Sequence, residues 1–254
     1  MSDLFNLPAP INVTAGDTSE TDVVVFFADE NGLLPKAAAE AGNAATRLNN
    51  WLARTRFNAK KGEVTIWSSK HATAVIVGVA NKKLDAEGLR NLGTKLSKEL
   101  DARCIASANV VLEKFGLCAG QTLVAFTYGL QLGIYHHNMK STDSYERSVC
   151  TVNLTPFAKS RCNAAKMISK ANGLAAGSMY MKKLVELPPN MLGTRQLAEA
   201  AQHIGNLFPA VKVNIKEQSE LEAEGFGSML AVGRASAQDS LVVELRYEGD
   251  ADAP

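Results

Sequence analysis

The sequence predicts an α/β fold in which a largely parallel sheet is covered by helices on both faces. Short apolar runs rich in β-branched residues, "DVVVFF" (22–27), "VTIW" (64–67) and "TAVIVGVA" (73–80), are typical of strands buried on both faces. Segments with apolar residues at helical spacing separate these runs from later ones, so strand and helix alternate. At 254 residues the chain is long enough for one or two domains with real cores.

The helices of the first half can be placed from their apolar spacing. "LPKAAAEAGNAATRLNNWLARTR" (34–56) predicts one crossover helix with Leu48 and Leu52 facing inward. A second helix follows residue 84, with Asp85 as its N-cap. Its inner face is expected to carry Leu89, Leu92, Leu96 and Leu100.

Two more strands are expected at "CIASANVVL" (104–112) and "RSVCTVNL" (147–154), with a helix between them at 119–137. The residues that this helix turns inward are expected to be Leu123, Phe126, Leu130 and Ile134.

The second half begins with a long helix over 164–185, which stops before Pro188 and Pro189. A helix capped by Thr194, a strand at 211–215, a short helix at 218–225 and a strand at 240–247 should follow. We expect an N-terminal α/β domain over 1–157, a linker helix and proline corner over 158–189, and an incomplete α/β domain over 190–254. The proline corner should be architectural, since X-Pro pairs usually mark boundaries.

Composition excludes several classes of protein. With 27 basic and 26 acidic residues the net charge is +1, which does not indicate a nucleic-acid or membrane partner. The apolar runs are too short to cross a membrane, and the start "MSDLFNLPAP" does not resemble a signal peptide, so we expect a cytoplasmic protein. The four cysteines form no C-x-x-C pair and are expected to be reduced, mostly packed thiols.

Between residues 172 and 247 the chain carries an ordered set of motifs. These are an "LV-x-x-P-x-N" corner, an "LA-x-x-A" helix, a "V-x-V" strand, an "E-x-x-G-x-G-x-x-L-A-V-G" segment and an apolar strand ending in tyrosine. Their order resembles the entry into the catalytic domain of the leucyl aminopeptidase family, the cytosolic metalloaminopeptidases of peptidase family M17. The first half resembles the family more loosely, in element order and in "DAEGLRNLG" and "GLQLGIY". "MLGTRQLA" and "VGRAS", with Ala235, depart from the family pattern and suggest a divergent branch.

The resemblance implies a macro-domain-like N-terminal domain followed by the start of a peptidase domain. For the intact enzyme it implies peptide substrates, two divalent metals (manganese or zinc) and a hexamer. The family's metal-binding motifs, GKG-x-x-F-D-x-GG and N-T-D-A-E-G-R, do not occur in these 254 residues. We therefore expect no catalytic, metal-binding or cofactor-binding residue in this chain, and no aminopeptidase activity from the chain alone.

The histidines are the first candidates to weigh against that expectation. His136 and His137 are adjacent, and neighbouring residues on a helix point about 100° apart, so both cannot ligate one metal without help. Exposed or capping histidines at a helix end are the favoured interpretation. His71 and His203 are isolated and are expected at the surface or in packing.

Three other segments also have simpler interpretations. The carboxylates Glu217, Glu220, Glu222 and Glu224 fit the solvated face of a short helix. "GFGSMLAVG" (225–233) follows an acidic helical segment, whereas a dinucleotide fingerprint needs a strand before it. A basic segment near Trp51 and Phe57 could contact phosphates but fits a solvated face better. Its cations are Arg47, Arg54, Arg56, Lys60 and Lys61.

Two functions from different classes follow. The first is a leucyl-aminopeptidase-like enzyme, of which these residues form the N-terminal domain and the start of the catalytic domain. The alternative is a non-catalytic family member or fragment with a structural, assembly or DNA-contacting role. An open reading frame that continues into the GKG-type and NTDAEGR-type motifs would favour the first.

Overall fold

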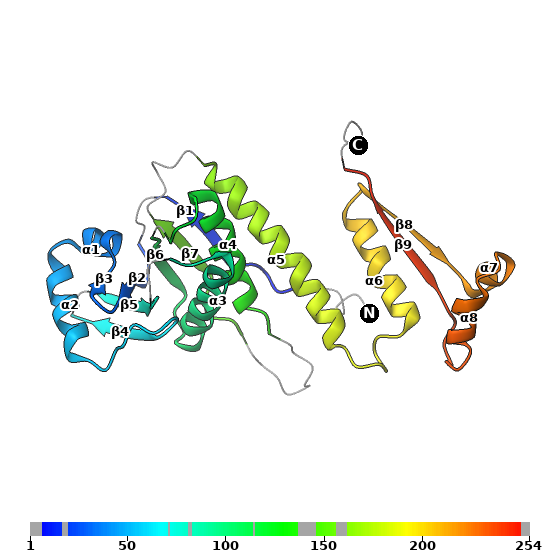
Figure 1. Ribbon diagram of the computed structural model, residues 1–254, viewed down its shortest axis with the longest axis horizontal. Helices are drawn as coiled ribbons and strands as arrows, with labels where there is room; N and C mark the ends of the chain where they lie inside the picture. The colour runs from blue at the N-terminus through cyan, green and yellow to red at the C-terminus, as the bar shows by residue number, and fades with distance from the viewer. Residues whose placement is uncertain are drawn as a thin grey trace. The chain divides into compact units, whose positions relative to one another are not determined.

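The computed structural model describes residues 7–16, 20–70, 72–80, 83–113, 115–136, 146–155 and 162–249. It confirms the predicted α/β class, with a mostly parallel sheet flanked by helices (Figure 1). The chain forms two compact units: one spans Pro8–Met179, and the other begins at Tyr180 and includes Leu7. The boundaries expected at residues 157 and 190 stay predictions.

The sheet of the first unit is built from short strands. They are β1 (Asn12–Ala15), β2 (Val23–Asp29), β3 (Gly32–Leu33), β4 (Val64–Ser68), β5 (Thr73–Gly78), β6 (Ser107–Val111) and β7 (Thr151–Thr155). Their order is β1-β7-β6-β2-β5-β4, with β3 paired to β2 beside this path. β4 runs antiparallel to β5 and β3 antiparallel to β2, while the remaining pairs are parallel. The short edge strand β1 was not expected from the sequence.

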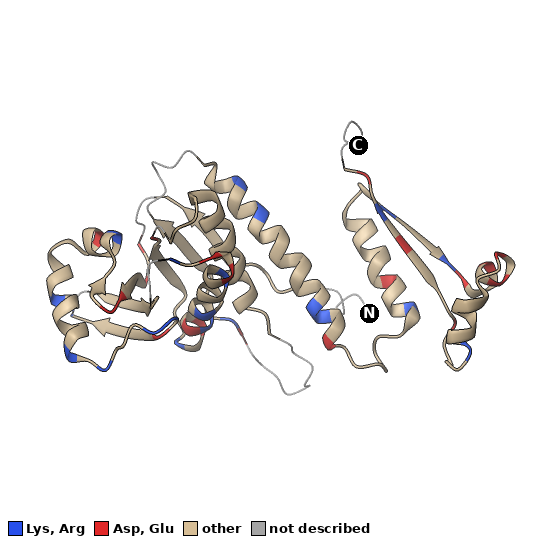
Figure 2. Ribbon diagram, viewed as in Figure 1, with Lys and Arg blue, Asp and Glu red and all other residues tan. Residues whose placement is uncertain are grey.

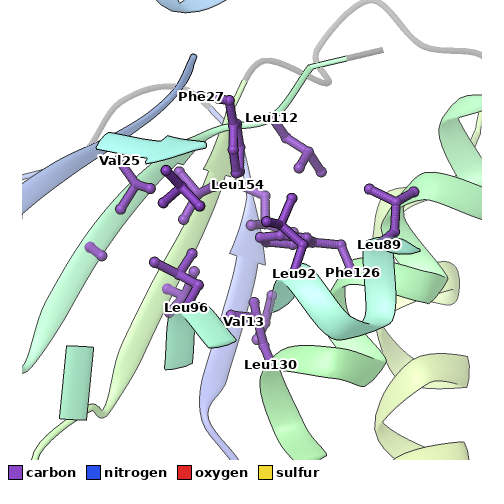
Figure 3. Close-up of a cluster of buried hydrophobic side chains, with 14 of the residues drawn as sticks. Val13, Val25, Phe27, Leu89, Leu92, Leu96, Leu112, Phe126, Leu130 and Leu154 are labelled. Atoms are coloured by element: carbon purple, nitrogen blue, oxygen red, sulfur yellow. The ribbon is translucent and has the colours of Figure 1, made fainter. Parts of the chain in front are cut away.

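Helices cover both faces of this sheet, because its strands carry apolar side chains on both faces. One face carries α3 (Ala86–Ala102), α4 (Ala119–Gly133) and the start of α5 (Ala164–Glu186). The other carries α1 (Pro35–Ala41) and α2 (Ala45–Arg54). Successive residues of β2 point to opposite cores. Val25 and Phe27 belong to the first (Figure 3), and Phe26 and Ala28 belong to the second.

Most expected helix features are confirmed. The side chain of Asp85 caps α3 by accepting a 2.7 Å hydrogen bond from the backbone N–H of Gly88. The leucines expected on the inner face of α3, and the four inward residues expected for 119–137, are buried. The single helix expected over 34–56 was wrong, because the chain breaks into α1, a 3-10 turn (Gly42–Ala44) and α2. Gly42 adopts φ +52, which interrupts helical hydrogen bonding.

The packing of α3 on α4 depends on glycine. A Cβ added to Gly129 would lie 2.1 Å from the backbone oxygen of Arg90, and one on Gly93 would lie 2.4 Å from the oxygen of Phe126. Any side chain at these positions would force two helix backbones apart. This close approach brings Phe126 of α4 against Phe27 of β2, with ring centroids 6.1 Å apart.

We therefore predict opposite effects for two glycine substitutions in helices. Gly129→Ala should destabilise the first unit by about 1–3 kcal/mol, because the added methyl group overpacks a rigid contact. Gly177→Ala in α5 meets nothing within 4 Å and should stabilise by about 0.5–1 kcal/mol through lower chain entropy. Urea unfolding of the two variants measures both effects, and equal effects would contradict the glycine contact.

The first half of α5 belongs to the core of the first unit. Ile168, Ala171 and Ala175 are buried, and Ile168 lies in the same cluster as Leu123 and Phe126. Asn172 accepts a 3.0 Å hydrogen bond from Gln131, whose side chain also bonds both backbone groups of Ile11. Helix α5 therefore does more than connect, since its first turns close one face of the sheet.

A chain shortened after Met179 should accordingly fold better than one shortened after Phe157. The longer fragment keeps the apolar turns of α5 on the sheet, so it should unfold in one cooperative transition at higher urea concentration. The shorter fragment should expose the groups that α5 covers and unfold earlier. Circular dichroism during urea titration measures the difference, and equal midpoints would place the boundary near residue 157.

The second unit is smaller. Its elements are the end of α5, then α6 (Thr194–Leu207), β8 (Val211–Lys216), α7 (Gln218–Ala223), α8 (Gly227–Gly233) and β9 (Val242–Tyr247). β8 and β9 pair as a two-stranded antiparallel sheet. Tyr180, Leu184 and Leu187 of the preceding segment pack with Ala200 of α6.

The proline corner joins α5 to α6 through a tight turn. The carbonyl of Pro188 accepts hydrogen bonds from the N–H groups of Met191 (2.8 Å) and Leu192 (3.0 Å). Thr194 does not cap α6 as expected: Gly193 is the N-cap residue, and the N–H of Thr194 donates to Gln238 at 2.8 Å.

Candidate functional site

The described histidines do not gather at a site. His136 is exposed just after α4, and the ring of His203 stacks on Tyr180 with centroids 6.3 Å apart. His71 and His137 lie outside the described residues. Among the residues that the structure describes, no three His, Cys, Asp or Glu side chains come together as metal ligands. These residues therefore do not fit the two-metal centre that the family resemblance implies.

The glutamates of the second unit are engaged with neighbouring groups. Both carboxylate oxygens of Glu217 accept 2.7 Å hydrogen bonds from Arg195. Glu224 pairs with Lys216, and Glu220 accepts from the backbone N–H of Glu217 at 2.8 Å. The guanidinium of Arg195 lowers the pKa of Glu217, and the carboxylate raises the pKa of Arg195 in turn. The cluster thus tethers α6 and β8 to α7.

Replacing Arg195 should move the titration of Glu217. Since its folded pKa lies below the ordinary value of 4.5, the pair stabilises the fold above pH 4.5, and this stabilisation is lost as the pH falls through the lowered pKa. Arg195→Gln should raise the Glu217 midpoint toward 4.5, as followed by carboxyl carbon NMR. Lys212→Gln, at an exposed lysine of β8, should leave it in place. An unchanged midpoint in the Arg195 variant would show that the pair does not form.

The glycine and basic segments keep their simpler interpretations. "GFGSMLAVG" follows α7 and forms α8, without the strand that a dinucleotide fingerprint needs before it. In the basic segment, Trp51 and Phe57 are partly buried and pack against the core on the α2 side of the sheet, as the interpretation of a solvated face with aromatic packing expects. Figure 2 marks Lys and Arg positions along α2 and the segment that follows it. The expectation that nucleic acid is not a partner stays a prediction.

The cysteines differ from expectation in one respect. Cys104, Cys118 and Cys150 are exposed rather than packed, because each lies at the end of a helix or strand and not within a buried face.

Across the described parts of the chain, no helix has the length and apolar character needed to cross a membrane.

The described residues of the first unit line a polar cavity and a largely apolar one. A polar one of about 420 Å³ is lined by Asp29, Asn49 and Asn58 at the end of β2. A second, of about 580 Å³, lies among α3, α4 and α5 and is lined largely by apolar side chains. The sequence reasoning missed this groove, because its walls come from segments up to 88 residues apart, from Ala86 to Leu174, and carry no shared motif.

The second unit exposes many large apolar side chains. Val232 is 85% exposed, Tyr247 75% and Leu245 48%. Leu197, Leu207, Phe208 and Met229 are at least 46% exposed as well. So many apolar side chains on a unit this small indicate a surface that is normally covered.

The strand β9 also has an open edge. The N–H of Glu248 donates to the carbonyl of Ala210, so the alternation of antiparallel pairing turns the N–H groups of Glu244 and Arg246 toward β8. The N–H groups of Val243, Leu245 and Tyr247 face the other edge, where the described residues provide no strand. Open edges of this kind invite pairing with another segment.

Comparison with known proteins gives a family match over the second unit. The model of the catalytic domain of the cytosol aminopeptidase family matches residues 179–254, which begin one residue before the second unit. Over these residues the chain is similar to the cytosol aminopeptidase family. This confirms the resemblance drawn from the sequence, and the family is one of aminopeptidase hydrolases.

Relatives of this family match across most of the chain. A probable cytosol aminopeptidase of Methylorubrum extorquens is 28% identical over 239 residues, covering 91% of this chain and 47% of that protein. One of Xanthomonas oryzae is 25% identical over 251 residues, covering 96% and 51%. The chain therefore spans about half the length of the curated relatives it matches.

Solved structures share the fold. A tomato leucine aminopeptidase mutant aligns with a TM-score of 0.82 at 20% identity, over 94% of this chain and 51% of the other. The bottromycin maturation enzyme BotP, in complex with Mn, aligns with a TM-score of 0.69 at 19% identity, over 89% and 45%.

Proposed function

We propose that these residues form the N-terminal unit and the opening of the peptidase domain of a leucyl-aminopeptidase-like enzyme. In its intact form the enzyme removes N-terminal residues from peptides, and its metal-binding and catalytic groups come from residues outside these 254. The observation that carries the proposal is the agreement between the family match over 179–254 and a structural unit that begins at Tyr180.

The surface of the second unit supports this assignment. A sheet edge with three outward N–H groups, beside exposed Leu245 and Tyr247, suits pairing with a further strand of the same domain. The role of the chain within such an enzyme is structural: the catalytic segment packs against α6 and the β8–β9 pair. No step of the reaction is assigned to a residue of this chain.

The remaining properties are proposed from the family alone. The intact enzyme would act on peptides in the cytoplasm, with two divalent metals, manganese or zinc, and as a hexamer. In such enzymes bound metals supply an activated water and stabilise the charge that develops during hydrolysis. The BotP structure with Mn is consistent with manganese use elsewhere among the structural relatives.

Amide hydrogen exchange tests the open edge. In the 254-residue chain, the amides of Val243, Leu245 and Tyr247 should exchange fast, while those of Glu244 and Arg246, which face β8, should exchange more slowly. When the chain is extended with a catalytic segment of the family, the first three should become protected. Slow exchange of all five in the 254-residue monomer would mean that the second unit closes by itself.

Activity and metal content should be measured on the same two samples. The 254-residue chain should hold no stoichiometric zinc or manganese after dialysis and should not hydrolyse a leucyl anilide with added manganese. The extended chain should bind zinc or manganese stoichiometrically and should hydrolyse the leucyl anilide. Hydrolysis by the shorter chain would mean that the active site has been misplaced, and an inactive extended chain that nevertheless protects β9 would favour the non-catalytic family member.

A further inference from the structure

The groove among α3, α4 and α5 is not used by the proposed function. Its volume of about 580 Å³ lies within the range of small-molecule sites. Val124 and Tyr128 of α4 and Met167 and Leu174 of α5 give it apolar walls. Leu174 is 50% exposed, so a large apolar side chain is held open to solvent at this place.

Helices α4 and α5, which line the groove, touch each other at two places. Near its start, α5 lies close to α4, since a Cβ on Gly120 would be 3.3 Å from the sulfur of Met167. Farther along, the hydroxyls of Tyr128 and Ser178 join the two helices at 2.8 Å. On the other side, close contacts at Gly93 and Gly129 pack α3 against α4.

The polar groups that line the groove are cations and neutral donors. Arg90 reaches it from α3 and Lys170 from α5, and neither makes an ion pair with another described residue. The described lining residues include no Asp or Glu. The first half of α5 carries Lys166 and Lys170 and no acidic residue, as Figure 2 shows. The side-chain oxygen of Gln121 accepts from the N–H of Cys118, which leaves its amide hydrogens as donors.

From this arrangement we propose that the groove binds a small amphipathic anion, namely a carboxylate carried on an aromatic or aliphatic body. The carboxylate lies between the guanidinium of Arg90 and the ammonium of Lys170, where charge-assisted hydrogen bonds are strongest. The apolar body packs against Val124, Met167 and Leu174, with the ring of Tyr128 at one end. The site is independent of the peptidase chemistry and lies wholly within the first unit.

NMR titration of the intact 254-residue chain with phenylacetate tests the site. Amide signals of the first turns of α4 and of α5 around Lys170 should shift, with a dissociation constant on the order of 1–10 mM, as expected for a ligand of this size. Phenylacetamide, which lacks the charge, and acetate, which lacks the ring, should each bind at least about tenfold more weakly. Equal binding of phenylacetate and phenylacetamide would overturn the role of the cations.

Charge variants complete the test. Arg90→Gln and Lys170→Gln should each weaken phenylacetate binding by about tenfold. Arg54→Gln, the same change at an exposed arginine of α2 on the other face of the sheet, should leave it unchanged. Leu174→Asp, at an exposed position, should abolish binding by repulsion while urea unfolding stays close to that of the native chain. Absence of shifts in α4 and α5 up to about 20 mM, or equal weakening by Arg54→Gln, would overturn the proposal.

Discussion

The burial of β2 on both faces is the constraint on which the first unit depends. Val25 and Phe27 need one helical layer and Phe26 and Ala28 need another, so a single layer of helices would leave one set in water. The chain satisfies both by placing α1 and α2 on one face and α3, α4 and α5 on the other. The close glycine contact between α3 and α4 follows from the same demand, because it lets two helices share the surface above β2.

The second unit lacks a comparable centre. Its buried residues are a few alanines of α6 together with Tyr180, Leu184, Leu187 and Leu221. Burial raises the pKa of Tyr180, whose hydroxyl donates a 2.9 Å hydrogen bond to the carbonyl of Ala200. Around this small core, large apolar side chains remain exposed. The two units therefore differ in how much apolar surface they bury: the first has a layered core, and the second leaves large apolar side chains exposed.

Much of the fold and little of the site could be predicted from the sequence. The strands at 22–27 and 73–80, the cap at Asp85 and the inner leucines of α3 were predictable, because each depends on neighbours within a few residues. The break at Gly42 was missed, because the apolar spacing continues as in a helix across it. The cap at Gly193 was missed, because the N–H of Thr194 bonds to Gln238, which is 44 residues away in the chain. The groove among α3, α4 and α5 could not be predicted, because its lining residues are far apart in the sequence.

By itself, the sequence determined the α/β class, the family resemblance and the helix–proline–helix corner, because apolar periodicity and the order of motifs can be seen along the chain. Only the tertiary structure decided that the first turns of α5 belong to the core of the first unit, that Glu217 is held by Arg195, and that Arg90 and Lys170 line one groove. These depend on which helices pack together and how far apart they stand, and no local pattern encodes a distance between segments 80 residues apart.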